Sequence, residues 1–535
     1  MKTNGFGTGF DGLGLTGDIG RRQLLKAGAA VGLGIGASAL LPGASAFAAA
    51  LATEVPKKGG RLKLGLAGGQ TTNTLDQARG GFGSPVERTV NYTLYNTLVE
   101  IAPNGQAVPE IAESWDIGPG AKSWVFNIRK GVTFHNGKEM TADDVVHSLR
   151  RHMGADTKSG AAGLLKEIES IEKVDKHQVR VQHATGNADL HYLLSDYHLA
   201  IVPAETTTVD GVGTGGYVLQ TYEPGVRFVA KRNPNYWKEG RAHVDEVEFV
   251  VVNDDAARLS ALQSGEVHGI NRLDPKTVAL LGKAPGLRII NSAGTAYYVI
   301  NMRADRAPFD NKDLRLALKY AINREQMLDR LLRGYGTVGN DHPIAKSMPF
   351  FDAKLPQRTQ DLDKAKFHFK KSGHSGALDL RTSTAAFSSA IDMAVLLKMQ
   401  AAEAGIDINV VREPQDGYWE NVWRSKEFMI SYWTGRAVPD QIFTTAYYSK
   451  AAWNDTHWRN DSFDALLLAA RTELDSAKRT QMYAEMQAIM QDDSGAIVPM
   501  FNNFLDGMRD AVKGDLTASN MELAGCRIAE RCWLA

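Results

Sequence analysis

The alternation of apolar and polar positions is clearest between residues 109 and 151. Trp124, Phe126 and Ile128 are separated by single residues, and this period of two predicts a half-buried strand. Lys130-Gly131 interrupts the pattern. Residues 132–135 are expected to form a second strand, because Asn136-Gly137 after them suits a tight turn.

A helix is predicted directly after this pair. Thr141 and Asp144 have the spacing of a capping box, in which a hydroxyl and a carboxylate three residues apart satisfy backbone N–H groups. Val145, Val146 and Leu149 then follow at helical intervals. The stretch therefore reads as a strand–strand–helix unit.

The same patterns continue along the chain. Strands are expected at 59–67, 244–252, 297–301, 406–411, 428–430 and 496–501. Helices are expected at 89–99, 255–265, 314–324, 361–371, 388–405, 461–472 and 477–490. Strands that alternate with helices predict an α/β fold.

Length and charge narrow the class of protein. A chain of 535 residues exceeds one ordinary core, so two or three lobes are expected. The 61 basic and 61 acidic residues are balanced, which argues against a nucleic-acid partner. The thirteen histidines are scattered, and neither a metal site nor a cofactor is expected.

The first 46 residues have the features of a cleaved export signal. Arg21-Arg22 precedes a Gly/Ala-rich run from Ala27 to Leu41, and Ala44-Ser-Ala46 is a cleavage site of the A-x-A type, with 48–50 as an alternative. The pair resembles a twin-arginine signal, the alternative being an ordinary basic dipeptide. No cysteine lies near it, so no lipid anchor is expected, and the predicted location is the periplasm.

Two cysteines, Cys526 and Cys532, lie near the C-terminus. In an oxidising compartment they can close a small disulfide loop, and two free thiols are the equally open alternative.

Several stretches together resemble the family 5 extracellular solute-binding proteins, the dipeptide-, oligopeptide-, opine- and nickel-binding receptors of ABC importers. They are the run from Pro109 to Trp115, residues 124–137, the capping box, Gly213 to Tyr217, Arg232 to Trp237 and Leu314 to Arg324. The resemblance covers nearly all of residues 59–535.

The resemblance implies a periplasmic binding protein fold of the class C type: two lobes joined by hinge strands, with an extra subdomain. The expected parts are the signal at 1–46, lobe I at 59–95 and 200–290, subdomain II at 96–199, lobe III at 291–495, and the return to lobe I with the C-terminal tail at 496–535. The implied ligand is a short peptide or peptide-like molecule, and the implied partners are a separate permease and ATPase. A monomer is expected.

The stretch from Ser431 to Asp440 is the strongest site candidate. Peptide-binding relatives have a Trp-x-Gly-Asp-like run here, whose aspartate pairs with the ligand's ammonium group. Trp433 and Gly435 fit, but Arg436 takes the acidic position. A guanidinium suits a carboxylate or phosphate, so Arg436 is predicted either to contact an acidic group of the ligand or to pair internally with Asp440 or another carboxylate.

The resemblance offers further candidates with packing roles as their alternatives. They are Tyr418, Trp419, Phe82, Phe501 and Asn502.

Three other functions are weighed. An opine-like or other carboxylate-rich ligand competes with a peptide because of Arg436. A periplasmic hydrolase is disfavoured, since no Gly-x-Ser-x-Gly, His-Glu-x-x-His or Walker motif is present. A receptor or chaperone that presents its ligand to a sensor is the third.

Overall fold

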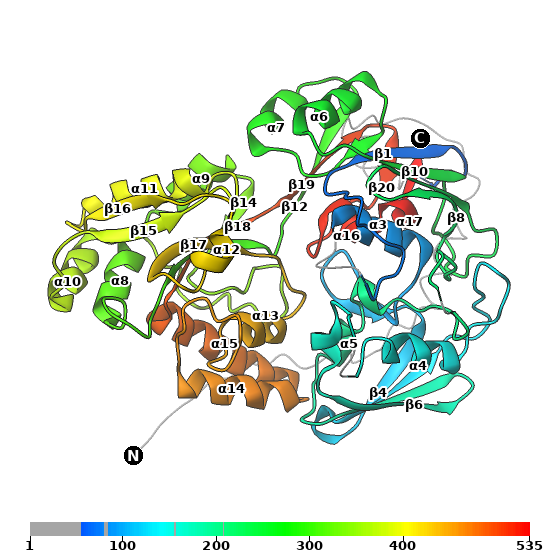
Figure 1. The fold of residues 1–535 in the computed structure, drawn as a ribbon, viewed down its shortest axis with the longest axis horizontal. Coiled ribbons are helices and arrows are strands. Elements are labelled where there is room, and N and C mark those ends of the chain that lie inside the picture. Colours follow the sequence, from blue (N-terminus) through cyan, green and yellow to red (C-terminus); the bar gives the residue numbers. More distant parts are fainter. Residues whose placement is uncertain (1–54, 80–83, 155–156, 207) are drawn as a thin grey trace, which may run out of the picture. The chain divides into compact units, whose positions relative to one another are not determined.

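The computed structural model describes residues 55–535 apart from 80–83, 155–156 and 207 (Figure 1). Residues Pro56–Ala535 form one compact unit. The expected export signal at 1–46 and the candidate Phe82 lie outside the described residues. Within the described part, no helix has both the length and the apolar character needed to cross a bilayer.

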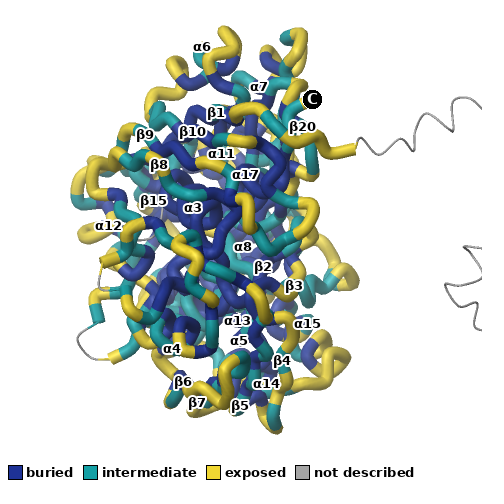
Figure 2. Tube along the Cα trace, turned by 90° about the vertical axis from the view of Figure 1, so that its right-hand side faces the viewer, coloured by how far each residue is buried: buried dark blue, intermediate teal, exposed yellow. Residues whose placement is uncertain are grey.

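Three larger sheets organise this unit, and we propose to divide it by them into lobe I, subdomain II and lobe III. The boundaries of lobe III differ from those expected from the sequence, because β12 (Leu287–Ser292) pairs in the sheet of lobe I and β18 (Ala496–Asn502) pairs in the sheet of lobe III. Most buried residues lie on or between these sheets and the helices that cover them (Figure 2).

Lobe I contains a seven-stranded sheet that draws strands from both ends of the unit. Leu62, Leu64 and Leu66 of its central strand are fully buried, as the alternation predicted. That strand, β1, is parallel to β10 and β11, and the other pairs are antiparallel. The order is β12 (Leu287–Ser292), β19 (Phe504–Arg509), β11 (Gly269–Ile270), β1 (Arg61–Leu66), β10 (Glu246–Val251), β9 (Arg227–Arg232), β8 (Tyr217–Glu223). Its helices are α3 (Pro85–Leu94), α6 (Asp255–Ser264), α7 (Pro275–Leu281), α16 (Glu522–Cys526) and α17 (Ile528–Arg531).

Subdomain II contains a four-stranded antiparallel sheet. Its order is β4 (Ala112–Ile117), β5 (Ser123–Ile128), β7 (Gln178–His183), β6 (Ile168–Asp175), with α4 (Ala142–Arg150) and α5 (Leu190–Leu193). Trp124, Phe126 and Ile128 of β5 are buried, which confirms the predicted strand. The backbone N–H of Thr141 donates to the Asp144 carboxylate at 2.8 Å, so the predicted helix start is also confirmed.

The predicted strand at residues 132–135 is wrong. Phe134 N–H donates to the Lys138 carbonyl and Met140 N–H to the Val132 carbonyl, and only one isolated bridge, Thr133–Glu139, forms. The segment folds back on itself within eight residues, so it has no partner for a longer ladder.

Lobe III is built on a six-stranded sheet between two helical layers. Its order is β14 (Gly336–Val338), β18 (Ala496–Asn502), β13 (Tyr297–Met302), β17 (Phe428–Trp433), β15 (Leu378–Thr382), β16 (Ile408–Arg412). Ile300 of β13 packs in one core and Val299 in another, because successive strand residues face opposite sides. One core includes α8 (Lys312–Ala321), α9 (Arg324–Leu332), α10 (Leu362–Ser372) and α11 (Ala390–Ala402), and the other α13 (Pro439–Ala446), α14 (Asp461–Thr472) and α15 (Ser476–Asp493).

The chain passes between lobe I and lobe III only twice within the described residues: at 293–296, between β12 and β13, and at Asn503, between β18 and β19. The two crossings touch. Asn502 N–H donates to the Ala296 carbonyl at 3.0 Å, and a Cβ added to Gly294 would lie 2.3 Å from the Asn502 carbonyl oxygen. This pair of crossings forms a narrow hinge between β12–β19 and the six-stranded sheet (Figure 1).

The C-terminal tail carries two buried free thiols rather than a disulfide. Cys526 ends α16, where its sulfur approaches the Met521 sulfur, whereas Cys532 opens β21 (Cys532–Leu534), which pairs with β20 (Val512–Gly514). The structure therefore contains the free-thiol alternative, and the disulfide is not formed in it. Burial raises the pKa of each thiol to about 12.

Candidate ligand site

The strand that carries Trp433 is longer than predicted. The strand was expected at residues 428–430, but β17 continues to Trp433. The extra residues pair with β13, in which Tyr297 lies opposite both Trp433 of β17 and Phe501 of β18. Pairing with the central strand β13 therefore extends β17. It places Trp433, Phe501 and Asn502 together at the same end of their neighbouring strands.

The turn after Trp433 packs on the hinge. A Cβ on Gly435 would lie 1.9 Å from the Thr295 Oγ1 and 2.9 Å from the Thr295 carbonyl carbon. Only glycine allows this approach, so the turn and the crossing segment are held together. Thr295 is buried, and its hydroxyl has no hydrogen-bond partner among the described residues. Sequence reasoning missed Thr295, although it is a polar residue just before a predicted apolar strand.

Arg436 makes only local contacts with neutral groups. Its Nη1 donates to the Thr434 carbonyl at 3.0 Å, the Thr434 hydroxyl at 2.8 Å and the Gly435 carbonyl at 3.2 Å. Burial lowers the pKa of the guanidinium, while Tyr297 and Asp196 favour its charged form and Arg88 opposes it. Within the described part of the chain no carboxylate pairs with Arg436, so it remains available to an anionic group.

Asp196 and Arg88 come from the other side of the hinge. Asp196 precedes the short helix η4 (Tyr197–Leu199), and its Oδ1 lies 2.6 Å from the His198 Nδ1, whereas Arg88 belongs to α3. Nothing in the sequence around these two residues marks them, because their relation to Arg436 arises only from folding.

Asp440 lies elsewhere, in the first turn of α13. Arg471 Nε donates to its Oδ1 at 3.0 Å, and the Thr444 hydroxyl lies 3.3 Å from the same oxygen. Burial raises the pKa of this carboxyl, and the Arg471 charge opposes that shift. The alternative of an Arg436–Asp440 pair is therefore wrong in this structure, since Asp440 is engaged by α14.

A buried carboxylate holds Trp433 in place. Asp455 accepts hydrogen bonds from the indole N–H groups of Trp423 at 2.9 Å and Trp433 at 2.8 Å, and from the Ser431 hydroxyl at 3.1 Å. Burial raises the pKa of Asp455 to about 6, and these three donors oppose that shift. The position of Trp433 is thus fixed by three neutral donors on one carboxyl group.

The two remaining aromatic candidates differ from each other. Tyr418 is 1% exposed in the core on the α8–α11 side, and its hydroxyl donates to the Ile430 carbonyl at 2.6 Å, so it does not join the Trp433 turn. Trp419 is 37% exposed and meets Trp423 and Tyr432 edge to face.

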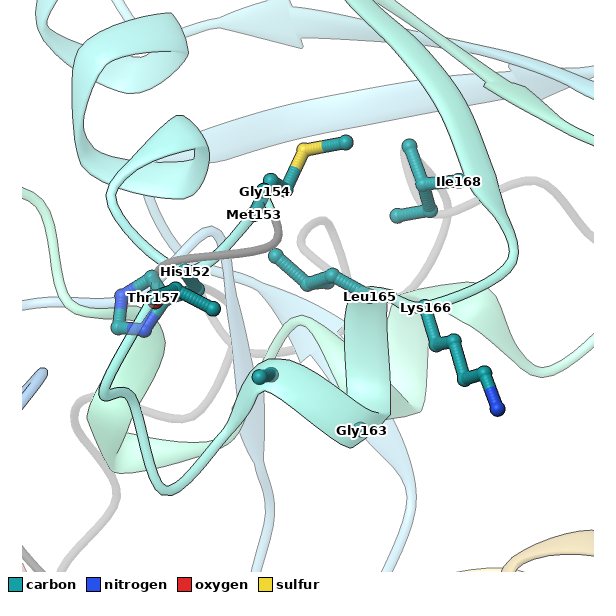
Figure 3. Close-up of a pocket in the computed structure, with 9 residues that line it drawn as sticks. His152, Met153, Gly154, Thr157, Gly163, Leu165, Lys166 and Ile168 are labelled. Atoms are coloured by element: carbon teal, nitrogen blue, oxygen red, sulfur yellow. The ribbon is translucent and has the colours of Figure 1, made fainter.

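Two hollows lie away from these residues. One, of about 370 Å³, is in subdomain II, where Met153, Leu165 and Ile168 form an apolar wall and His152 and Thr157 lie to one side (Figure 3). The other, of about 530 Å³, lies beside Trp237 and Lys238. Neither is lined by Trp433 or Arg436.

Comparisons with known proteins place this architecture. Residues 106–455 match the family model of bacterial extracellular solute-binding proteins, family 5, middle part. The dipeptide-binding protein of Escherichia coli (strain K12) is 26% identical over 461 residues, covering 79% of this chain and 86% of that protein. Heme-binding protein A of Haemophilus influenzae is 27% identical over 448 residues, with 75% and 80% covered.

Solved structures agree in fold. The periplasmic binding protein DppA from Helicobacter pylori, in complex with peptide STSA, has a TM-score of 0.72 at 22% identity and covers 89% of this chain and 98% of its own. AgaA from A. tumefaciens R10, in complex with agropinic acid, also has a TM-score of 0.72 at 22% identity, with 89% and 99% covered.

Proposed function

Because the chain belongs to the family 5 bacterial extracellular solute-binding proteins, we propose that it is the ligand receptor of an ABC importer. It captures a short peptide or peptide-like molecule between its lobes and delivers it, unchanged, to a separate permease and ATPase. The observation that carries the proposal is the family match over residues 106–455, supported by relatives named dipeptide-binding proteins.

The hinge gives the proposal its mechanism. Periplasmic binding proteins close around their ligands by hinge motion, and closure requires a ligand that binds the closed form better than the open form. The Thr295–Gly435 contact couples the crossing segment to the turn that carries Arg436. A ligand bound by this turn would therefore lie next to the hinge about which the lobes rotate.

The ligand contacts proposed here are centred on the edge of β17, β13 and β18. Trp433 and Phe501 supply apolar surface, and Gly435 and Asn502 supply close backbone approach. Trp419, Tyr418, Asp440 and Phe82 stay on the list of proposed site residues, Tyr418 and Asp440 as groups that shape the site from behind.

Arg436 points to the chemistry of the ligand. A half-buried guanidinium bound only to neutral oxygens gains most from a carboxylate, which it can hold through two parallel hydrogen bonds. A peptide presents one such group at its C-terminus. An opine-like or otherwise carboxylate-rich ligand presents more, and AgaA, with its agropinic acid, has the same fold.

The setting of the receptor is proposed with it. The chain is exported with a cleaved twin-arginine signal, carries no lipid anchor, works as a periplasmic monomer and has no enzymatic activity.

The test begins with native mass spectrometry of the protein purified from its own host, to identify a bound ligand. Calorimetry then compares that ligand with wild type, Arg436→Met and Arg412→Met, an exposed arginine on β16. We expect Arg436→Met to weaken binding by ten- to a hundredfold, as for loss of one charged hydrogen-bonded contact, and Arg412→Met to leave it unchanged. Equal affinity of all three proteins refutes the role of Arg436, and turnover of the ligand refutes the receptor function.

A further inference from the structure

A connecting loop of subdomain II is buried. Residues 186–189, between β7 and α5, are all buried. Connecting loops normally lie on the surface, because their backbone groups need water or a partner. Another part of the molecule must therefore cover this loop and bind its polar groups.

The cover is the α14–α15 corner of lobe III, and α5 lies beside the helices of that lobe in both views (Figure 1, Figure 2). Ala188 N–H donates to the Arg471 carbonyl at 2.8 Å. Arg479 Nη2 donates to the Asp189 Oδ2 at 2.6 Å, and the two side chains are only 9% and 2% exposed. Glu167 adds a weaker approach to Arg471 at 3.8 Å.

Each half of this contact is rigid within its own lobe. In subdomain II, Asn187 N–H donates to the Ala121 carbonyl at 3.0 Å, and Gly186 has a φ of +89° that brings it against the Gly120 carbonyl. In lobe III, Arg479 Nε donates to the Ala470 carbonyl at 3.1 Å, and the guanidinium lies over the Phe350 ring at 4.8 Å. The two charges are thus positioned for each other before they meet.

The path of the chain between the lobes shows which motion would break this contact. Subdomain II is continuous with lobe I, and lobe III joins lobe I only through residues 293–296 and Asn503. Rotation about that hinge separates residues 186–189 from α14 and α15 without breaking any sheet. Such a rotation breaks the Asp189–Arg479 pair.

We propose that Asp189 and Arg479 form a latch that holds subdomain II against lobe III in the absence of ligand and so sets the fraction of closed receptor. In the open form both charges are solvated. In the closed form they are buried together, and removing one partner leaves the other buried and uncompensated, which penalises the closed form alone. The apparent affinity for any ligand that selects the closed form falls in proportion to the closed fraction.

The latch is tested without ligand, so its outcome does not depend on the proposed receptor function. Lys130 of subdomain II and Lys366 of α10 are exposed, and cysteines there accept a donor and an acceptor dye. Cys526 and Cys532 can stay, because buried thiols with a pKa of about 12 are scarcely ionised at pH 7 and react slowly with maleimides.

Single-molecule energy transfer is then compared between wild type, Asp189→Asn, Arg479→Met and the double variant. The control is Asp143→Asn, which breaks an exposed ion pair with Lys173 inside subdomain II. We expect a predominantly closed wild type and control, and a fall of at least tenfold in the closed-to-open ratio for each single variant. The double variant recovers part of the loss, because no charge is left buried alone.

Two results overturn the latch: a wild-type protein that is open without ligand, or single variants with the distance distribution of the wild type. Circular dichroism of each variant distinguishes opening from unfolding, since opening leaves secondary structure intact. The two proposals fail separately. A protein that binds its ligand but shows no effect of the single variants refutes the latch alone, and a protein that shows the latch but binds no ligand refutes the receptor function alone.

Discussion

Replacing Asp455 by asparagine tests how the site holds Trp433. The carboxylate accepts from two indole N–H groups and one hydroxyl in a buried position, and burial raises its pKa to about 6. The unfolded chain has the ordinary value of about 3.9. Between these values the folded protein binds more protons than the unfolded one, so the contribution of Asp455 to stability is fully present at low pH and falls as pH rises to 6.

The size of the effect follows from the shift. About two pKa units correspond to about 3 kcal/mol, of which about 2 kcal/mol falls between pH 4 and pH 7. Asparagine cannot ionise, so the free energy of unfolding of Asp455→Asn does not fall with pH for this reason. Its NH₂ group instead faces an indole donor, and that mismatch costs about 1–3 kcal/mol at every pH. Relative to Asp455→Asn, the wild type therefore loses about 2 kcal/mol of stability between pH 4 and pH 7.

The assay is guanidinium unfolding of ligand-free protein, followed by tryptophan fluorescence, at pH 4, 5, 6 and 7. Asp361→Asn is the control, because this carboxylate caps α10 and the Lys364 backbone N–H holds its pKa below the usual value. Its effect should stay constant between pH 5 and 7. A difference between wild type and Asp455→Asn that does not change with pH would refute the reasoning.

Two further predictions concern the hinge and the tail. Gly435→Ala forces a Cβ onto Thr295 and should lower the free energy of unfolding, measured by denaturant titration, by about 1–3 kcal/mol. Gly163→Ala is the control, because open space surrounds Gly163, and it should have little effect. Equal effects of the two substitutions would contradict the predicted clash. Cys526 and Cys532 should react with a thiol reagent slowly in the native protein and completely, two thiols per chain, after non-reducing denaturation, and fewer than two reactive thiols would contradict the free-thiol assignment.

The elements of the core could be predicted because their patterns are local. The alternation in β5, the capping residues of α4 and the apolar spacing of α14, found at the predicted Asp461–Thr472, are readable within ten or twelve residues. The segment at 132–135 and the extension of β17 to Trp433 were misread, since a strand exists only where another strand pairs with it.

The site shows the same division. The run of tryptophan, glycine and arginine at Trp433, Gly435 and Arg436 could be read from the sequence alone. Folding alone pairs Asp440 with Arg471, places Thr295 against Gly435, and brings Asp189 to Arg479, 290 positions further along the chain. These contacts depend on how the sheets and lobes pack together. The residues around a charged side chain do not show which distant group of opposite charge it will meet.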